Sequence, residues 1–296
     1  MRPLRERLAA GDALVGDGAM GTMLFERGLP PGEPPETVTL ARPAVLEEIA
    51  RLYLEAGADL LETNTFGASP LKLALHGLEA ETEAVNREAV RAVRRVAEGR
   101  AYVVASCGPS GRLLEPYGDV AEAAMLASFR RQMDALAGAG VDAVCVETMT
   151  DLREAALAVR AAKDADPALP VLATMTFDPT PRGYFTIMGV SIAAAAAGLA
   201  EAGADAVGSN CGNGIAHMVA IAREFRALSR LPLVIQANAG LPKSVAGHAV
   251  YDETPAFLAE NARELLDYGV SVIGGCCGTT PEHIRALRAM VDGARR

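Results

Sequence analysis

Short apolar runs recur along the chain, and each is followed by a polar or glycine-rich tip and then by a helical pattern of Ala, Leu, Glu and Arg. Such runs are typical of buried parallel strands. The pattern predicts eight strands, at Ala13–Gly16, Asp59–Thr63, Tyr102–Ser106, Ala143–Glu147, Pro170–Thr176, Ala206–Ser209, Pro232–Gln236 and Val270–Ile273. The stretches between them predict helices over Pro43–Ala56, Glu79–Ala97, Val120–Ala139, Leu152–Ala162, Ser191–Ala202, Ala216–Leu228 and Thr254–Tyr268.

Glycines end several of these helices directly before the next strand, and we expect a left-handed backbone at each. They are Gly57, Gly140, Gly203 and Gly269. Repeated helix–Gly–strand units predict a parallel sheet with right-handed crossovers. Eight units in 296 residues predict a single α/β domain over residues 1–296, a (β/α)₈ TIM barrel with its active site at the C-terminal ends of the strands. The alternative is a doubly wound open sheet, but its usual glycine fingerprint after the first strand is absent.

The segment Pro30–Pro35 is proline-rich, but it lies between the first strand and the first predicted helix. We therefore expect a surface excursion there rather than a domain boundary. The interior should be aliphatic, because half of the residues are hydrophobic, aromatic residues make up 4% and Trp is absent.

The net charge of −9 and the pI near 5.1 oppose nucleic-acid binding, which requires a basic patch. The N-terminus has no apolar signal region, and no stretch reaches the ~18 apolar residues of a membrane helix. We therefore expect a cytoplasmic enzyme acting on small metabolites, with no membrane association. Five cysteines, an odd number, favour metal binding or catalysis over a disulfide framework in that compartment.

The stretch VSVIGGCCGTT, residues 270–280, places Cys276 and Cys277 at the carboxyl end of a predicted strand. Neighbouring side chains on an extended chain point to opposite faces, so both can bind one ion only if the flanking glycines bend the backbone. Cys211, in AVGSNCGNG, follows a strand in a similar setting and supplies a third thiolate. Three sulfur ligands leave one position open on a tetrahedral zinc ion, which is the arrangement of a catalytic site.

The alternative is that these cysteines are small buried hydrophobic residues, a common state of free Cys. The Gly-Gly-Cys-Cys-Gly setting favours the metal site, and a disulfide between adjacent cysteines would be strained. Of the other candidates, Cys145 is expected in the core and Cys107 at a strand tip facing the pocket. His283, near the cysteines in TTPEHI, is expected on a helix surface rather than as a ligand.

In such a barrel the active site gathers at the carboxyl ends of the strands. The eight tips read GDGAMGT, ETNTFGAS, SCGPSGR, VETMTD, TMTFD, SNCGNG, QANAG and GGCCGTT. Most of their polar residues are also ordinary turn formers or helix caps, and we favour that interpretation for Thr65, Ser106 and Thr148. Glu62 and Glu147 differ, because a carboxylate beside a buried strand costs free energy unless it is paired or binds a cation.

In DGAMGT, Asp17 stands beside exposed backbone N–H groups, those of Gly18 and Ala19 among them. A carboxylate beside N–H donors can hold an ammonium and a carboxylate together, as a free α-amino acid requires. Asn238, in QANAG, lies at the tip between the two cysteine-bearing strands. It is either an ordinary turn residue or a neutral oxygen ligand for the open zinc position.

Taken together, DGAMGTML, ETNTFGAS, GPSGRLLEPYGD, VETMTD, QANAG and GGCCGTTPEHI resemble the zinc-dependent homocysteine S-methyltransferases. They look most like the homocysteine-binding module of cobalamin-dependent methionine synthase, from about Leu14 to about Met290. The resemblance implies a (β/α)₈ barrel in which three cysteines bind Zn²⁺, with Asp17 and Glu147 holding the amino acid. It also implies that Asn238 lies near the zinc when no thiol is bound. The metal ligands are then Cys211, Cys276 and Cys277, and the substrate-binding residues Asp17, Gly18, Ala19, Asn64, Glu147 and Asn238.

The implied reaction transfers a methyl group to the thiol of L-homocysteine and gives L-methionine. Zinc binding would deprotonate the thiol while leaving it electron-rich among three other thiolates. The chain carries no Asp-x-His-x-x-Gly corrinoid signature, so methylcobalamin would have to come on a separate corrinoid protein. The loops Tyr184–Val190 and Ala239–Ala246 are candidates for its docking surface, or for a lid over a small sulfonium.

Three alternatives to this interpretation remain. The same transfer could use S-methylmethionine or a betaine as donor, although the strand tips favour the cobalamin-dependent branch. The chain could instead be a zinc-binding partner module without catalysis of its own. A barrel hydrolase with zinc-activated water is disfavoured, because such sites usually have histidine or carboxylate ligands rather than three thiolates.

Overall fold

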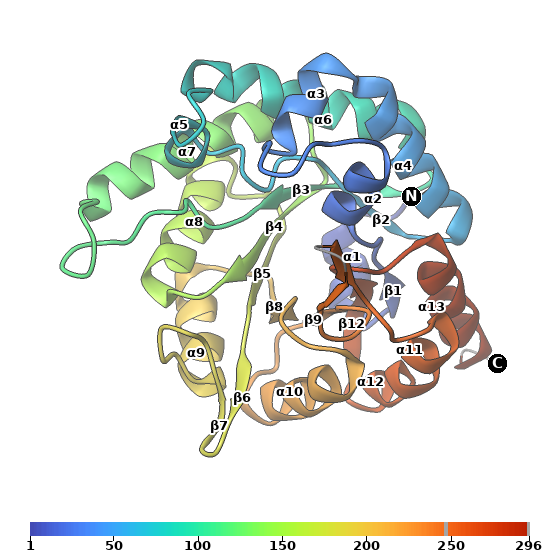
Figure 1. The fold of residues 1–296 in the computed structure, drawn as a ribbon. Helices are drawn as coiled ribbons and strands as arrows, with labels where there is room; N and C mark the ends of the chain where they lie inside the picture. The colour runs from blue at the N-terminus through green and yellow to red at the C-terminus, as the bar shows by residue number, and fades with distance from the viewer. Residues whose placement is uncertain (246–247, 295–296) are drawn as a thin grey trace.

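Eight parallel strands form a nearly closed barrel surrounded by helices in the computed structural model, which describes residues 1–245 and 248–294 (Figure 1). The strands lie in the order β1-β12-β9-β8-β5-β4-β3-β2. Their bounds are β1 Leu14–Val15, β2 Leu60–Glu62, β3 Tyr102–Cys107, β4 Ala143–Met149, β5 Val171–Met175, β8 Ala206–Asn210, β9 Leu233–Ala237 and β12 Val270–Gly275. The first and last strands pair in parallel through Leu14 with Val272 and Val15 with Ile273. The predicted (β/α)₈ barrel is therefore confirmed, and the open sheet is excluded.

The ladder is incomplete between β1 and β2, and aspartate side chains help to join the two strands. The backbone N–H of Asp59 donates to the carbonyl of Val15 at 2.7 Å, and Val15 N–H donates to the Asp59 carboxylate at 2.9 Å. Farther along, Glu62 N–H donates to Asp17 Oδ2 at 2.8 Å. We call this junction the β1–β2 seam.

The helices alternate with the strands and form a ring around them (Figure 1). Those that follow the predicted pattern are α4 Pro43–Ala56, α6 Thr82–Ala97, α7 Glu122–Gly138, α8 Leu152–Ala165, α9 Ile192–Ala202, α10 Ile215–Leu228, α11 Pro255–Ala262 and α12 Glu264–Asp267, and α13 Pro281–Ala294 follows the last strand. The predicted helix Thr254–Tyr268 is thus two helices, with a turn at Arg263. The four predicted helix-ending glycines all have positive φ, between 62° and 104°.

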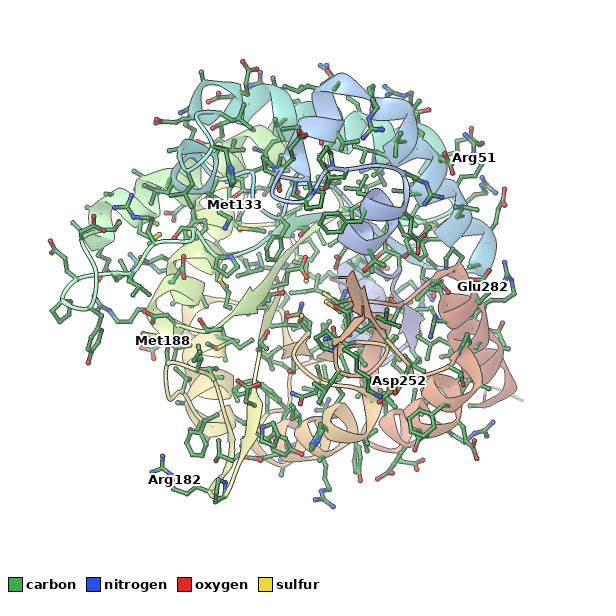
Figure 2. All side chains as sticks on the ribbon, viewed as in Figure 1. Arg51, Met133, Arg182, Met188, Asp252 and Glu282 are labelled. Carbon is green, nitrogen blue, oxygen red and sulfur yellow. The ribbon has the colours of Figure 1, made fainter. Side chains whose placement is uncertain are left out.

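Further short elements were not predicted. They are α1 Leu4–Ala9, α2 Met20–Glu26, α3 Glu36–Ala41, α5 Pro70–Ala74, the 3₁₀ helix η1 Glu79–Glu81, and two hairpins, β6 Asp178–Thr180 with β7 Gly183–Phe185 and β10 Lys243–Val245 with β11 His248–Val250. Figure 2 shows Arg182 at the outer end of the β6–β7 hairpin, away from the barrel. Residues 30–33 are exposed, which agrees with the predicted surface excursion.

The core has two parts. One lies between the strands and the helices, and the other fills the barrel with inward-facing residues from all eight strands, including Leu60, Val104, Cys145 and Leu172. Leu4 and Leu8 of α1 belong to this inner cluster, so α1 closes the barrel at the end opposite the strand tips. Within the described ranges, no helix is both long enough and apolar enough to cross a bilayer.

Candidate active site

A cavity of about 230 Å³ opens at the carboxyl ends of the strands. Its volume lies below the ~300–1,000 Å³ of sites for drug-sized ligands, so it suits a small metabolite. The tips of β1, β2, β3, β4, β8 and β12 contribute to its wall, as the barrel architecture predicts. The lining residues are Gly18, Ala19, Met20, Gly21, Thr22, Pro35, Glu62, Thr63, Asn64, Phe66, Ser106, Glu147, Thr148, Cys211, Gly275, Cys276 and Cys277.

Three thiols meet on one side of this cavity. The Sγ atoms of Cys211, Cys276 and Cys277 lie within 4.8 Å of one another, and those of Cys211 and Cys277 are 3.8 Å apart. Four ligands at about 2.3 Å from a tetrahedral ion would also lie about 3.8 Å apart, so this spacing fits a zinc–thiolate centre. The three cysteines are therefore placed so that they could hold one metal ion.

The backbone around the thiols is bent, as the glycine-rich sequence predicts. Cys211 has a left-handed φ of 60°, which is uncommon for a residue other than glycine. On the other strand, Cys276 N–H donates to the carbonyl of Ala237 at 2.7 Å, which ties the cysteine loop to β9. Gly275 must lack a side chain, because a Cβ there would stand 2.2 Å from Thr279 Oγ1.

Contacts among the sulfur atoms shift the pKa values of the thiols in opposite directions. Hydrogen bonds from Cys211 and then Cys276 lower the pKa of the Cys277 thiol. The same contacts, with burial, raise the pKa of Cys276 well above its usual range. One thiolate is therefore favoured among the three sulfur atoms, which is the form that binds metals.

Buried carboxylates form the other side of the site. The Glu147 carboxylate accepts hydrogen bonds from Ser106 Oγ and, at 3.0 Å, from Asn210 Nδ2. Burial, followed by the charge of Glu62, raises the pKa of Glu147 well above its usual range. Asp17 lies beneath the cavity beside Glu62, and burial and then the charge of Glu62 raise its pKa as well.

Asn210 links the carboxylate side to the thiol side. Its Oδ1 accepts hydrogen bonds from the backbone N–H of Thr148 at 2.7 Å and from Thr174 Oγ1 at 2.8 Å. That arrangement fixes the amide orientation, so Nδ2 is the atom that faces Glu147 and lies 3.9 Å from Cys276 Sγ. Thr148 has a φ of 58°, a strained conformation for a β-branched residue, and strain of this kind concentrates at functional sites.

Comparisons with known proteins identify the family. A sequence model described as homocysteine S-methyltransferase matches residues 14–291. The chain belongs to the homocysteine S-methyltransferase family. Within this family it is 36% identical to the methionine synthases of Mycobacterium leprae, over 94% of this chain, and of Mycobacterium tuberculosis, over 96%. It spans about a quarter of the length of those relatives, 24% and 25% respectively.

Solved structures of the homocysteine S-methyltransferase family agree with this assignment. The metallated form of the Escherichia coli homocysteine methyltransferase MmuM superposes with a TM-score of 0.80 at 27% identity, covering 97% of this chain and 99% of that one. Its oxidized form gives the same TM-score at 28% identity. A putative phosphonomutase from Burkholderia cenocepacia, with a TM-score of 0.51 and 18% identity, shares the fold alone.

Most of the residues that the resemblance to homocysteine S-methyltransferases predicted as binding residues line this same cavity. Gly18, Ala19, Asn64 and Glu147 lie in its wall with the three cysteines, whereas Asp17 and Asn238 lie beside it. The N–H of Ala19 donates to Thr279 Oγ1 at 3.2 Å, so that donor already has an acceptor within the protein.

Asn64 and Asn238 differ in their hydrogen bonding. The side-chain amide of Asn64 donates to the carbonyl of Pro35 at 2.8 Å and to Thr39 Oγ1 at 3.0 Å, which positions the segment before α3. Asn238 Oδ1 is buried and has no hydrogen-bond partner. A buried acceptor without a partner costs free energy and suits a position that receives a ligand.

The remaining predictions for this site are partly confirmed. Cys145 is in the barrel core, and Cys107 is fully buried beside Gln132 rather than in the cavity wall. The small, apolar side chain of Cys107 packs instead into the core between β3 and the surrounding helices. His283 is buried, with Nδ1 facing Thr280 N–H and Nε2 2.9 Å from the carbonyl of Glu253, so its expected place on a helix surface is wrong.

Several site residues were not identified as such from the sequence. Glu62, Ser106 and Thr148 all line the cavity, and only Glu62 gave a signal, as a carboxylate directly after a buried strand. Tyr251 packs its ring against Gly278, where a Cβ would approach Tyr251 Cγ to 2.1 Å. Burial and then the charge of Cys277 raise the pKa of the Tyr251 hydroxyl, which therefore stays protonated beside the thiols.

Proposed function

We propose that this protein is a zinc-dependent methyltransferase that converts L-homocysteine to L-methionine, with a methylated corrinoid on a separate protein as the donor. The observation that carries the proposal is the shared cavity, because three thiols spaced for a tetrahedral ion face it together with a buried carboxylate. A thiol-containing amino acid requires both groups, because a metal held by the thiols would bind its sulfur and the carboxylate would bind its ammonium.

The residues present fit a zinc ion. Cys211, Cys276 and Cys277 would hold it, and their sulfur spacing matches that expected for Zn²⁺. The unpartnered Oδ1 of Asn238 is a neutral oxygen on the loop whose next residue, Ala239, donates its N–H to the carbonyl of Cys277 at 3.0 Å. When bound, zinc supplies a fourth coordination position at which a substrate thiol loses its proton and keeps its nucleophilic electron pair.

The chain's own residues would position the amino acid. The carboxylates of Asp17 and Glu147 would receive its ammonium, and Asn210 and Ser106 keep the Glu147 carboxylate aimed at the cavity. The backbone at Gly18 and Ala19 forms part of the cavity wall and would face the carboxylate of the amino acid, although the N–H of Ala19 already donates to Thr279 Oγ1. Gly18 itself must lack a side chain, since a Cβ would stand 2.7 Å from Thr279 Oγ1.

The donor proposal rests on exposed apolar side chains in two loops at the carboxyl ends of β5 and β9. Within the loop Tyr184–Val190, Ile187 is 80% exposed and Met188 37%, and Leu241 of the loop Ala239–Ala246 is 56% exposed. Position 246 of that loop lies outside the described residues. Exposed apolar side chains in the loops that follow β5 and β9 suit a protein partner better than a closed small-molecule site. S-methylmethionine or a betaine remains the second candidate donor.

A three-donor assay tests the proposal. The zinc-loaded protein is incubated with L-homocysteine and, in turn, methylcobalamin, S-methylmethionine and glycine betaine, and L-methionine is measured. We expect methionine with methylcobalamin, because the exposed apolar side chains of these loops suit docking of a bulky donor carried by a protein. Activity only with S-methylmethionine or betaine would overturn the proposal of a corrinoid donor, and the proposal of methyl transfer to homocysteine would stand. Homocysteine binding without methionine from any donor would indicate a zinc-binding module without catalysis.

A further inference from the structure

Glu62 lies at the end of β2 with its side chain in the cavity wall, and its position is fixed from across the barrel. Its Oε1 accepts a hydrogen bond from Gln236 Nε2 of β9 at 2.9 Å. The Glu62 side chain also contacts the carboxylate of Glu147. Two acidic side chains in contact inside a barrel are costly unless a proton or another cation lies between them.

The site has no positive charge of its own. Among the described residues that line the cavity there is no Lys, Arg or His. Burial is the first cause that raises the pKa of Asp17, Glu62 and Glu147, which is the signature of carboxylates without a cationic partner. Gln236 adds a buried Oε1 that has no hydrogen-bond partner. A ligand that brings a positively charged donor would therefore satisfy acceptors that the described cavity residues leave without a cationic partner.

We propose that Glu62 is a further substrate-binding residue that determines specificity, receiving the α-ammonium of the substrate together with Glu147. Gln236 is its positioning residue, because its amide holds Glu62 Oε1 from across the barrel while the Glu62 side chain lies in the cavity wall beside Glu147. The site then selects thiols that carry an α-ammonium over thiols of the same length that lack one. This inference rests on the proposed function and names a determinant of its acceptor specificity.

A purely structural role for Glu62 would look different. Its backbone N–H already joins the β1–β2 seam through Asp17, and that bond does not depend on the Glu62 side chain. Glu154 shows what a structural carboxylate does in this fold, because its Oε1 accepts from both N–H and Oγ of Ser110, at 2.8 and 2.6 Å, outside the cavity wall. The Glu62 carboxylate differs, because it lies in the cavity wall and its side-chain contacts are Gln236, a second acid, Glu147, and the Cys145 thiol.

Calorimetric titration with two thiols tests the inference. The ligands are L-homocysteine and γ-mercaptobutyrate, which differ only in the ammonium group. For Glu62→Gln we expect homocysteine binding to weaken about tenfold or more, the effect of losing one charge-assisted contact, with γ-mercaptobutyrate binding and zinc content unchanged. Gln236→Leu should weaken homocysteine binding about fivefold with the same selectivity, and it provides the test if Glu62→Gln does not fold. Glu154→Gln, the matched control, should alter neither affinity.

The outcomes separate this inference from the function beneath it. If the unmodified protein binds neither thiol, the proposed function itself fails. If it binds homocysteine and Glu62→Gln weakens both ligands equally, or neither, Glu62 has no role in recognising the ammonium and the inference is overturned. Equal loss of both ligands in Gln236→Leu, with Glu62→Gln unfolded, would overturn it in the same way.

Discussion

Cys211 meets the adjacent pair Cys276 and Cys277 because its own backbone turns left-handed directly after β8. That conformation costs roughly 1–3 kcal/mol for a residue with a side chain, and the surrounding structure must offset it. A hydrogen bond from Cys211 N–H to the carbonyl of Gln236, at 3.1 Å, contributes to that offset. The strain is thus used to bring one sulfur to within 3.8 Å of another that lies 66 residues away.

Cys276→Ala is the sharpest test of the metal site. One ligand of three is lost, so we expect most of the zinc and all methyl transfer to be lost, measured as zinc per chain by atomic spectroscopy and as methionine formed. The fold should persist, because the site stands on loops above a packed barrel.

Cys145→Ala is the control for that test. The Cys145 thiol is buried in the barrel interior and is not among the three clustered thiols, so zinc and activity should be kept. Full zinc retention in Cys276→Ala would remove Cys276 from the ligand set.

At the residue scale, the polar side chains at the strand tips are easier to predict from the sequence than the contacts made across the barrel. The three cysteines all come shortly after apolar runs, and the fold brings all such tips to one face. The pairing of Glu62 with Gln236 spans 174 residues and depends on the curvature of the closed barrel. The role of Asn210 is equally hard to predict, since its side-chain amide makes four hydrogen bonds to Glu147 and Thr148 of β4 and Thr174 of β5, which are tertiary contacts that no local pattern records.

At the scale of elements, the regular strands and helices are predictable and the short ones are not. Helix α1 has only six residues, several of them charged, and isolated helices of that length are not stable in water. It exists because Leu4 and Leu8 enter the cluster inside the barrel, which is a tertiary effect. The β6–β7 hairpin is likewise held by its surroundings, with Tyr184 Oη 3.0 Å from His217 Nδ1.

Leu8→Ala tests whether α1 stabilises the barrel. Leu8 is 4% exposed, so truncating it should leave a cavity and lower the free energy of unfolding by about 2–5 kcal/mol. Urea unfolding followed by circular dichroism measures this, and the zinc content should not change. Leu228→Ala, at a position that is 50% exposed, should shift the free energy of unfolding by less than about 0.5 kcal/mol. Equal effects of the two substitutions would show that α1 contributes little.

At the scale of the whole molecule, the closed barrel rather than an open sheet is predictable from the count of strand–helix units. How the barrel closes is not, because β1 has only two residues in the ladder and the closure uses aspartate side chains. Asp59 also accepts a hydrogen bond from Arg288 of α13 at 2.9 Å, which connects the seam to the last helix of the chain. Such a role for an aspartate before a strand has no signature in the local sequence.

The β1–β2 seam has a consequence for local opening of the barrel in the native state. Where a continuous ladder is replaced by a few bonds, local opening requires less free energy than in the paired strands, so backbone amides there become accessible to solvent first. We expect hydrogen–deuterium exchange to be faster in peptides covering residues 13–17 and 59–63 than in those covering 143–147 and 171–175. Asp59→Ala should accelerate the first pair selectively, and uniform protection around the barrel would contradict this. The barrel would then open locally between β1 and β2 before any other strand pair separates, next to the strand tips that carry Asp17 and Glu62.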